Sequence, residues 1–172
     1  TIYYAILNET NSAEYVADGH TYWKNCVSAG TLDKRIKAQQ AAEASIRAGV
    51  AMFANVGVTL QEIAPPAVYQ RDTIVFGLRD GFDCRSICNA YVGNSDRPAT
   101  DLGHMIIHLG NEWCFHSPSV VVHEMLHRAG WEHEHGHPLR DTYVSFYPRS
   151  RSRNFVRTGV AGTDYDPCSV MH

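Results

Sequence analysis

The chain has 172 residues, with 15 Lys and Arg against 18 Asp and Glu, a net charge of −3. This length corresponds to about one domain, and the charge excludes the strongly basic character typical of nucleic-acid-binding domains. Hydrophobic residues make up 44 %, close to the globular average, which excludes extensive disorder. The apolar runs are far shorter than the roughly 20 residues of a membrane-spanning helix. We therefore expect one folded domain with no membrane span and no nucleic-acid partner.

The first half of the chain predicts strands around one long helix. Residues 1–7 are rich in Ile and Tyr and predict a strand, whereas the polar residues 8–33 show no clear period. Apolar side chains recur at helical spacing over residues 32–55, which predicts an amphipathic helix that a glycine ends. Residues 58–60 and 73–76 predict two further strands.

The second half predicts one more strand and a second helix. Residues 105–109 form a short apolar run that favours a strand. Residues 119–128 predict the second helix, and Gly130 is placed to end it. Residues after Pro138 show no regular pattern, so we expect an irregular C-terminal part.

The cysteines leave two interpretations of the compartment open. No Cys-x-x-Cys pair is present, so a zinc ribbon or finger is not indicated. Five buried thiols in a cytosolic protein are one interpretation, and two disulfides with one cysteine left over in a secreted protein are the other, which we favour. The N-terminus lacks signal-peptide features, so we expect any signal peptide to have been removed. The five are Cys26, Cys84, Cys88, Cys114 and Cys168.

The chemistry of the chain is concentrated after residue 122. His123 and His127 are four residues apart, so on a helix they project from one face and can share one metal ion. Gly130 allows a sharp exit from the helix, which brings His133 round as a third ligand. Three neutral nitrogen ligands with one open position are typical of a catalytic zinc site, so we expect one Zn²⁺.

Chance is the competing explanation of a bare His-Glu-x-x-His pattern, which occurs in many helices. The added glycine and third histidine at fixed offsets make chance remote. His135 and His137 compete for the role of third ligand, but the spacing after Gly130 favours His133. We interpret the other two as surface residues or as residues behind the ligands.

Glu124 follows the first ligand directly, so its carboxylate can reach a metal-activated water without coordinating the metal. It would act as the general base and then pass the proton to the leaving amine. The predicted reaction is zinc-dependent hydrolysis of a peptide bond.

The full pattern from His123 to His133 resembles that of the metzincin peptidases. Those enzymes also have a methionine turn beneath the metal, which Met171 in the stretch 169–172 would supply. Glu134 and the stretch 131–144 resemble the astacin family in particular, as do Asn154-Phe155 and Tyr165-Asp166. The likeness is strong from about residue 73 to residue 172 and weak before it.

The resemblance implies an α+β fold with a twisted mixed sheet, two long helices and an irregular C-terminal part with the Met-turn. The active-site helix would span about 119–129. An antiparallel edge strand would bind the backbone of a protein or peptide substrate. In mature astacins the glutamate matching Glu134 pairs with a buried N-terminal amino group, but Thr1 here begins the first predicted strand. The residues expected in the edge strand are Met105, Ile106, Ile107, His108 and Leu109.

The resemblance also implies a Cys88–Cys114 disulfide beside that strand. The second bridge of the family begins in the first long helix, which has no cysteine here, so Cys26–Cys168 and Cys84–Cys168 both stay open. Synthesis as a zymogen with an inhibitory pro-segment is a further implication.

Residues 1–172 are thus expected to form one astacin-like catalytic domain, cut short just after the Met-turn. The family's tyrosine two residues after the methionine is not reached. We predict a secreted zinc endopeptidase, and the alternative is a catalytically silent relative that binds zinc or a partner. Glu124 favours the enzyme, because a silent relative has no need of the base.

Overall fold

The computed structural model describes residues 1–6, 16–17, 20–21, 32–64, 73–77, 88, 90, 92–93, 106–108, 116–145, 155–157 and 162–172. The strands are β1 (Ile2–Ile6), β2 (Val16–Ala17), β3 (His20–Thr21), β4 (Leu60–Glu62), β5 (Thr73–Gly77) and β6 (Ile106–His108). The helices are α1 (Leu32–Phe53), α3 (Pro118–Arg128) and α4 (Arg140–Tyr143), with short 3-10 helices η1 (Ala54–Val56) and η3 (Glu134–Gly136). None of the described helices is both long and apolar enough to cross a membrane.

Four strands form one sheet in the order β4-β1-β5-β6, and each neighbouring pair is parallel. A parallel pair needs a long crossover connection, and α1 lies in the connection from β1 to β4. Tyr4, Ala5 and Ile6 of β1 are buried in succession, as expected for a central parallel strand that is covered on both faces. Strands β2 and β3 form a separate antiparallel ribbon.

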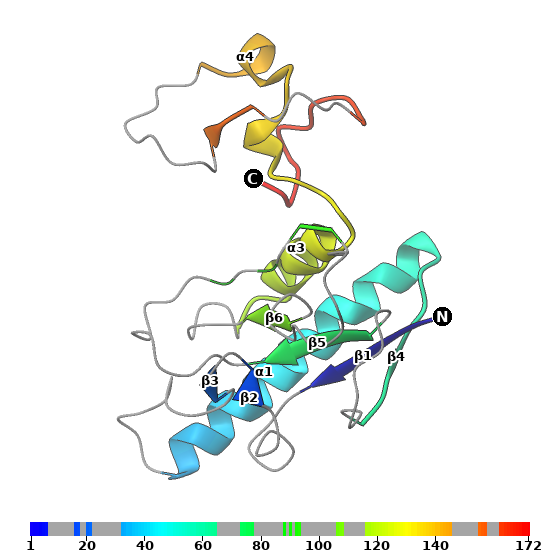
Figure 1. The fold of residues 1–172 in the computed structure, drawn as a ribbon, viewed down its shortest axis with the longest axis vertical. Helices are drawn as coiled ribbons and strands as arrows, with labels where there is room; N and C mark the ends of the chain where they lie inside the picture. The colour runs from blue at the N-terminus through cyan, green and yellow to red at the C-terminus, as the bar shows by residue number, and fades with distance from the viewer. Residues whose placement is uncertain are drawn as a thin grey trace.

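The hydrophobic core lies where the sheet meets α1 and α3, which pack against each other (Figure 1). Ala42, Ile46 and Val50 recur every four residues and form the buried stripe of α1. Gly49 lies beside this stripe, where α1 contacts the first turns of α3. A Cβ atom there would stand 2.8 Å from the Cβ of Val121.

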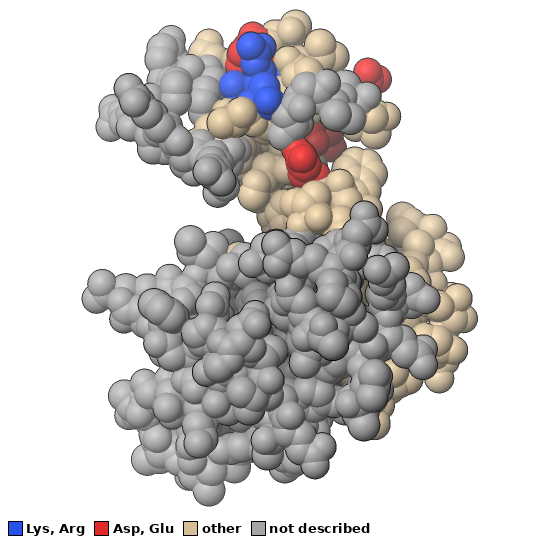
Figure 2. Space-filling model, viewed as in Figure 1, with Lys and Arg blue, Asp and Glu red and all other residues tan. Residues whose placement is uncertain are grey.

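The C-terminal lobe, defined as residues 131–145, 155–157 and 162–172, lies beyond α3 and away from the sheet (Figure 1). The described charged side chains that are visible in Figure 2 gather on this lobe. Arg140 connects several parts of this lobe and is only 5 % exposed. Its guanidinium group donates hydrogen bonds to the carbonyl oxygens of His135 and Phe155 and forms an ion pair with Asp141. Polar contacts therefore hold much of this lobe together.

Several sequence predictions need correction. The stretch 105–109 was expected to be an antiparallel edge strand, but β6 is parallel to β5. The 28 residues between Gly77 and Ile106 leave ample chain for the crossover that a parallel pair requires. Strand β4 begins at Leu60 instead of residue 58, and both the β2-β3 ribbon and α4 were missed. Met105 and Leu109 lie outside the described residues.

Candidate metal centre

Helix α3 presents the central motif and ends as the sequence predicts. Gly130 has a φ of 98°, in the left-handed region that glycine adopts without strain. Its N–H donates to His127 O, and the N–H of Trp131 donates to Leu126 O. These two bonds form a Schellman motif, which satisfies carbonyls at the end of the helix and turns the chain back. The turn carries residue 133 to the ligand face of α3.

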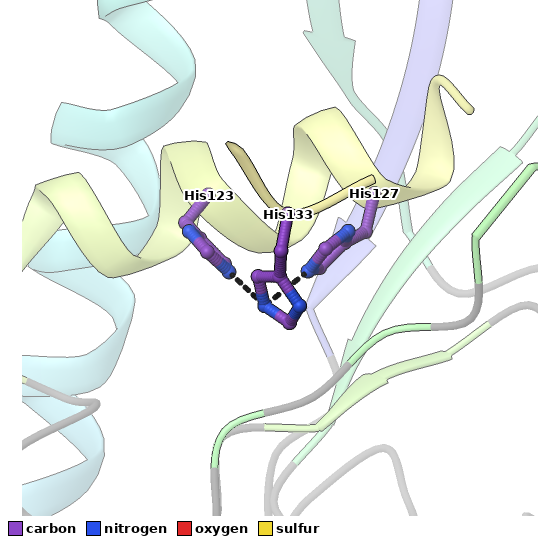
Figure 3. Close-up of side chains that lie close together, drawn as sticks. All are labelled: His123, His127 and His133. Carbon is purple, nitrogen blue, oxygen red and sulfur yellow. Dashed lines mark hydrogen bonds between the residues drawn. The ribbon is translucent and has the colours of Figure 1, made fainter. Parts of the chain in front are cut away.

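The rings of His123, His127 and His133 converge on one point (Figure 3). The Nε2 atom of His133 lies 3.2 Å from the Nε2 atoms of both His123 and His127. Two imidazole nitrogens at about 2.05 Å from a tetrahedral Zn²⁺ would stand ~3.3 Å apart. The spacing of the three rings therefore fits a shared metal ion.

Backbone carbonyls fix the orientation of two of these rings. The Nδ1 of His123 donates to Val170 O at 2.7 Å, and the Nδ1 of His127 donates to Trp131 O at 2.7 Å. A proton held on Nδ1 leaves the lone pair of Nε2 free to face a metal. The two ligand candidates on α3 are thus set in the tautomer that binds metal through Nε2.

The environment of His127 and His133 favours the neutral form of their rings. Burial, together with the neighbouring His127, His135 and His123, lowers the pKa of His133 to about 4. Burial also lowers the pKa of His127. Neutral imidazole is the form that ligates metal, whereas imidazolium cannot. The donor set of three imidazole nitrogens fits the zinc ion that the sequence motif implies.

Glu124 is only 3 % exposed on α3, one residue after His123. Burial raises the pKa of its carboxyl group to about 7, and a hydrogen bond from the Ala90 N–H opposes this rise. Its Oε2 atom has no hydrogen-bond partner among the described residues. A buried carboxyl group with one oxygen held and the other free has the character of a proton acceptor near neutral pH.

The turn at residues 169–172 contacts the first ligand candidate through the bond between Val170 O and His123 Nδ1. Met171 is 1 % exposed, and its carbonyl oxygen accepts the N–H of Glu134 at 2.9 Å. The side chain of Glu134 in turn accepts the N–H of Asp166 at 2.9 Å. Glu134 thus connects the segment after the third histidine to the C-terminal turn. Thr1, whose amino group corresponds to the partner of this glutamate in mature astacins, lies exposed beside the start of β1.

The structure shows where the other two histidines of the cluster lie. His137 is not a surface residue, because it is 8 % exposed and lies between the Thr163 carbonyl and the Leu139 N–H, which donates to its Nδ1. The ring of His135 stacks on His133 with centroids 4.6 Å apart, so His135 lies behind the third ligand candidate.

The cysteines are partly accounted for. Cys88 is disulfide-bonded, and Cys114 lies outside the described residues, so the Cys88–Cys114 pairing stays a prediction. Cys168 is free and exposed, so the Cys26–Cys168 and Cys84–Cys168 alternatives are both wrong. The N–H of Cys168 bonds to the side chain of Asp166, a local turn that leaves this residue facing solvent.

Sequence reasoning missed the contacts between α3 and the segment 88–93. Arg128 donates from Nη1 to Gly93 O at 2.7 Å, and the Gly93 N–H donates to His127 O at 2.8 Å. The sequence did hold one indication of a role for Arg128 near Glu124. The two residues are four apart, which places their side chains on one face of the helix. Nothing in the sequence indicated the Ala90 N–H.

Comparisons with known proteins agree with this geometry. Residues 16–172 match the family model described as Astacin, a peptidase family. Zinc metalloproteinase nas-14 of Caenorhabditis elegans is 28 % identical over 114 residues, which are 61 % of this chain and 19 % of that protein. Zinc metalloproteinase nas-6 of the same organism is 31 % identical over 115 residues, 60 % of this chain and 33 % of that protein. The chain thus aligns with a third or less of each of these two proteins.

A solved structure shows the same fold. High choriolytic enzyme 1, a hatching enzyme zinc-protease from the medaka fish Oryzias latipes, superposes with a TM-score of 0.56 at 19 % identity. The match covers 99 % of this chain and 66 % of that chain. The family model spans most of the sequence, including the three convergent histidines and Glu124, and the chain belongs to the astacin family of peptidases.

Proposed function

We propose that this chain is a zinc-dependent endopeptidase with His123, His127 and His133 as the metal ligands. The observation that carries the proposal is the convergence of the three rings, whose ligand nitrogens all lie within 4.8 Å of one another. The carboxyl group of Glu124 follows on the same helix, buried and with one oxygen that has no partner in the described part of the chain. A structural zinc site has no need of such a base beside it.

Zinc at this site would supply Lewis-acid activation of a water molecule and of the scissile carbonyl group. The free Oε2 of Glu124 accepts the proton of the attacking water, and the same oxygen then delivers it to the leaving amine. The Ala90 N–H holds the carboxylate in place during both transfers. Burial of Glu124 keeps its proton affinity close to that needed at neutral pH.

Protein or peptide chains are the proposed substrates.

The Met-turn role of Met171 is supported by its burial and by its carbonyl bond to Glu134. Secretion is supported by the disulfide at Cys88, because disulfides persist in oxidising compartments. Synthesis as a zymogen with an inhibitory pro-segment is part of the same proposal.

Glu124→Gln is the central test. The substitution keeps the shape of the side chain and leaves the three histidines intact, so the protein should bind zinc as the parent does. We expect casein cleavage to fall by roughly 10²–10⁴-fold, because the proton acceptor is lost. Zinc content is measured by metal analysis, and chelator-sensitive cleavage by the parent is the control.

Two outcomes would contradict the proposal. Full activity of Glu124→Gln would remove the base from the mechanism. A zinc-loaded parent that cleaves no protein or peptide would favour the silent, zinc-binding or partner-binding alternative.

A further inference from the structure

Arg128 carries a charge that the proposed reaction does not use. The residue is partly buried at the C-terminal end of α3, and desolvation lowers its pKa. Its Nε has no hydrogen-bond partner among the described residues, and none of the ion pairs found there includes it. Burying a guanidinium group without a carboxylate costs free energy, so its position calls for a reason.

The nearest carboxylate along the helix is that of Glu124, four residues earlier. A glutamate four residues before an arginine is the favourable order for an ion pair on a helix. Arg128 instead donates to Gly93 O at 2.7 Å, while Oε2 of Glu124 has no partner among the described residues. The guanidinium group is thus held by the backbone of another segment, and the described residues show no ion pair between it and the carboxylate of Glu124.

In the segment 88–93, Ala90 and Gly93 are each bonded to α3. Gly93 has a φ of 78°, and both its N–H and its carbonyl bond to α3, to His127 O and to Arg128. Three residues earlier, the Ala90 N–H bonds to the carboxylate of Glu124. Cys88, at the start of the segment, is disulfide-bonded.

We propose that Arg128 is a positioning residue for the general base. By binding Gly93 O, it holds Gly93, and with it Ala90 three residues earlier, against α3 and so keeps the Ala90 N–H on the carboxylate of Glu124. One carboxylate oxygen is then fixed and the other stays free for the proton. The inference rests on the proposed peptidase function, because it assigns a role in that reaction.

The test compares zinc-loaded Arg128→Met and Arg128→Lys with the parent. Methionine keeps the apolar stem and removes the donor, so kcat should fall by about 10- to 100-fold, the scale of a misplaced catalytic group. KM should stay within about twofold, because substrate binding is untouched. Lysine should recover most of the loss, because only one nitrogen of Arg128 bonds to Gly93 O. Arg47→Ala, an exposed arginine of α1, is the control with unchanged kcat.

Two further measurements separate positioning from general damage. In a Glu124→Gln background, Arg128→Met should cause no additional loss of kcat, because the residue through which it acts is gone. Independently of activity, hydrogen exchange of the Gly93 and Ala90 amides should accelerate in Arg128→Met and stay at the parent rate in Arg47→Ala.

An unchanged kcat in Arg128→Met, a loss that lysine does not recover, or a full additional loss in the Glu124→Gln background would overturn the assignment. Unaltered amide exchange would do so as well, even if Arg128→Met failed to retain zinc. Failure of the proposed function gives a different result, because the zinc-loaded parent itself then cleaves nothing. In that case both the peptidase function and the role of Arg128 are wrong.

Discussion

Replacing Gly49 by alanine tests the packing that places the ligand helix. Intrinsic helix propensity alone predicts that alanine stabilises an internal helical position by about 1 kcal/mol over glycine. The structure predicts the opposite sign. The new methyl group would stand 2.8 Å from both Cβ and Cγ1 of Val121 and 3.0 Å from Pro118 O.

The size of the effect follows from these contacts. Carbon atoms in ordinary contact are ~3.5–4.0 Å apart, so α1 and α3 would have to separate by about 1 Å. Overpacking of this kind costs ~1–3 kcal/mol, and a clash with the branch point of Val121 and a backbone oxygen favours the upper end. After the propensity gain is subtracted, we expect a net loss of about 2 kcal/mol. For a chain of 172 residues this lowers Tm by ~4–8 °C.

Calorimetry of the zinc-free proteins measures this directly. Ala48→Gly, at an exposed position of the same helix, reports the propensity term alone and should lower stability by about 1 kcal/mol. A higher Tm for Gly49→Ala would refute the reasoning, since it would show that propensity outweighs the contact with Val121. Because α3 also carries His123 and His127, zinc affinity should fall together with Tm.

Two more predictions concern pH and metal. Arg47 binds both carboxylate oxygens of Glu62 at 2.9 Å and lowers the pKa of this carboxyl group, so the pair stabilises the fold above the usual pKa of 4.5 and loses this effect as pH falls. Because both side chains are partly exposed, Glu62→Gln should cost at most about 1 kcal/mol at pH 7, and the difference in Tm from the parent should vanish in acid; a constant difference would contradict the ion pair. Zinc at 100 times its Kd should stabilise the protein by ~2.7 kcal/mol and raise Tm by ~5–10 °C. A chelator should reverse the shift, and an equal shift in His133→Ala would argue against the assigned ligands.

Local patterns predicted much of the scaffold. The spacing of Ala42, Ile46 and Val50 marked the buried face of α1, and Gly130 marked the end of α3, because both signals depend on a few neighbouring residues. The convergence of the three histidines also follows from a helix, a turn and a fixed offset.

Features set by distant pairing were not predictable in the same way. The direction of β6 depends on its partner β5 and on the path of the chain between them, which a short apolar run does not encode. The burial of His137 depends on the carbonyl of Thr163, 26 residues later. The contacts of Ala90 and Gly93 with α3 involve backbone groups, which every residue type carries, so no side-chain pattern indicates them.

The carbonyl groups that hold His123 and His127 have a consequence for variation at this site. Val170 and Trp131 contribute backbone oxygens to the two rings, and the two residues are 39 % and 47 % exposed. Substitution of either side chain leaves the backbone carbonyl oxygen in place, so the tautomers of the two rings do not depend on the side chains at these positions. The side chains at these two positions can therefore be substituted to change the surface beside the site, while the metal-binding nitrogens keep their orientation.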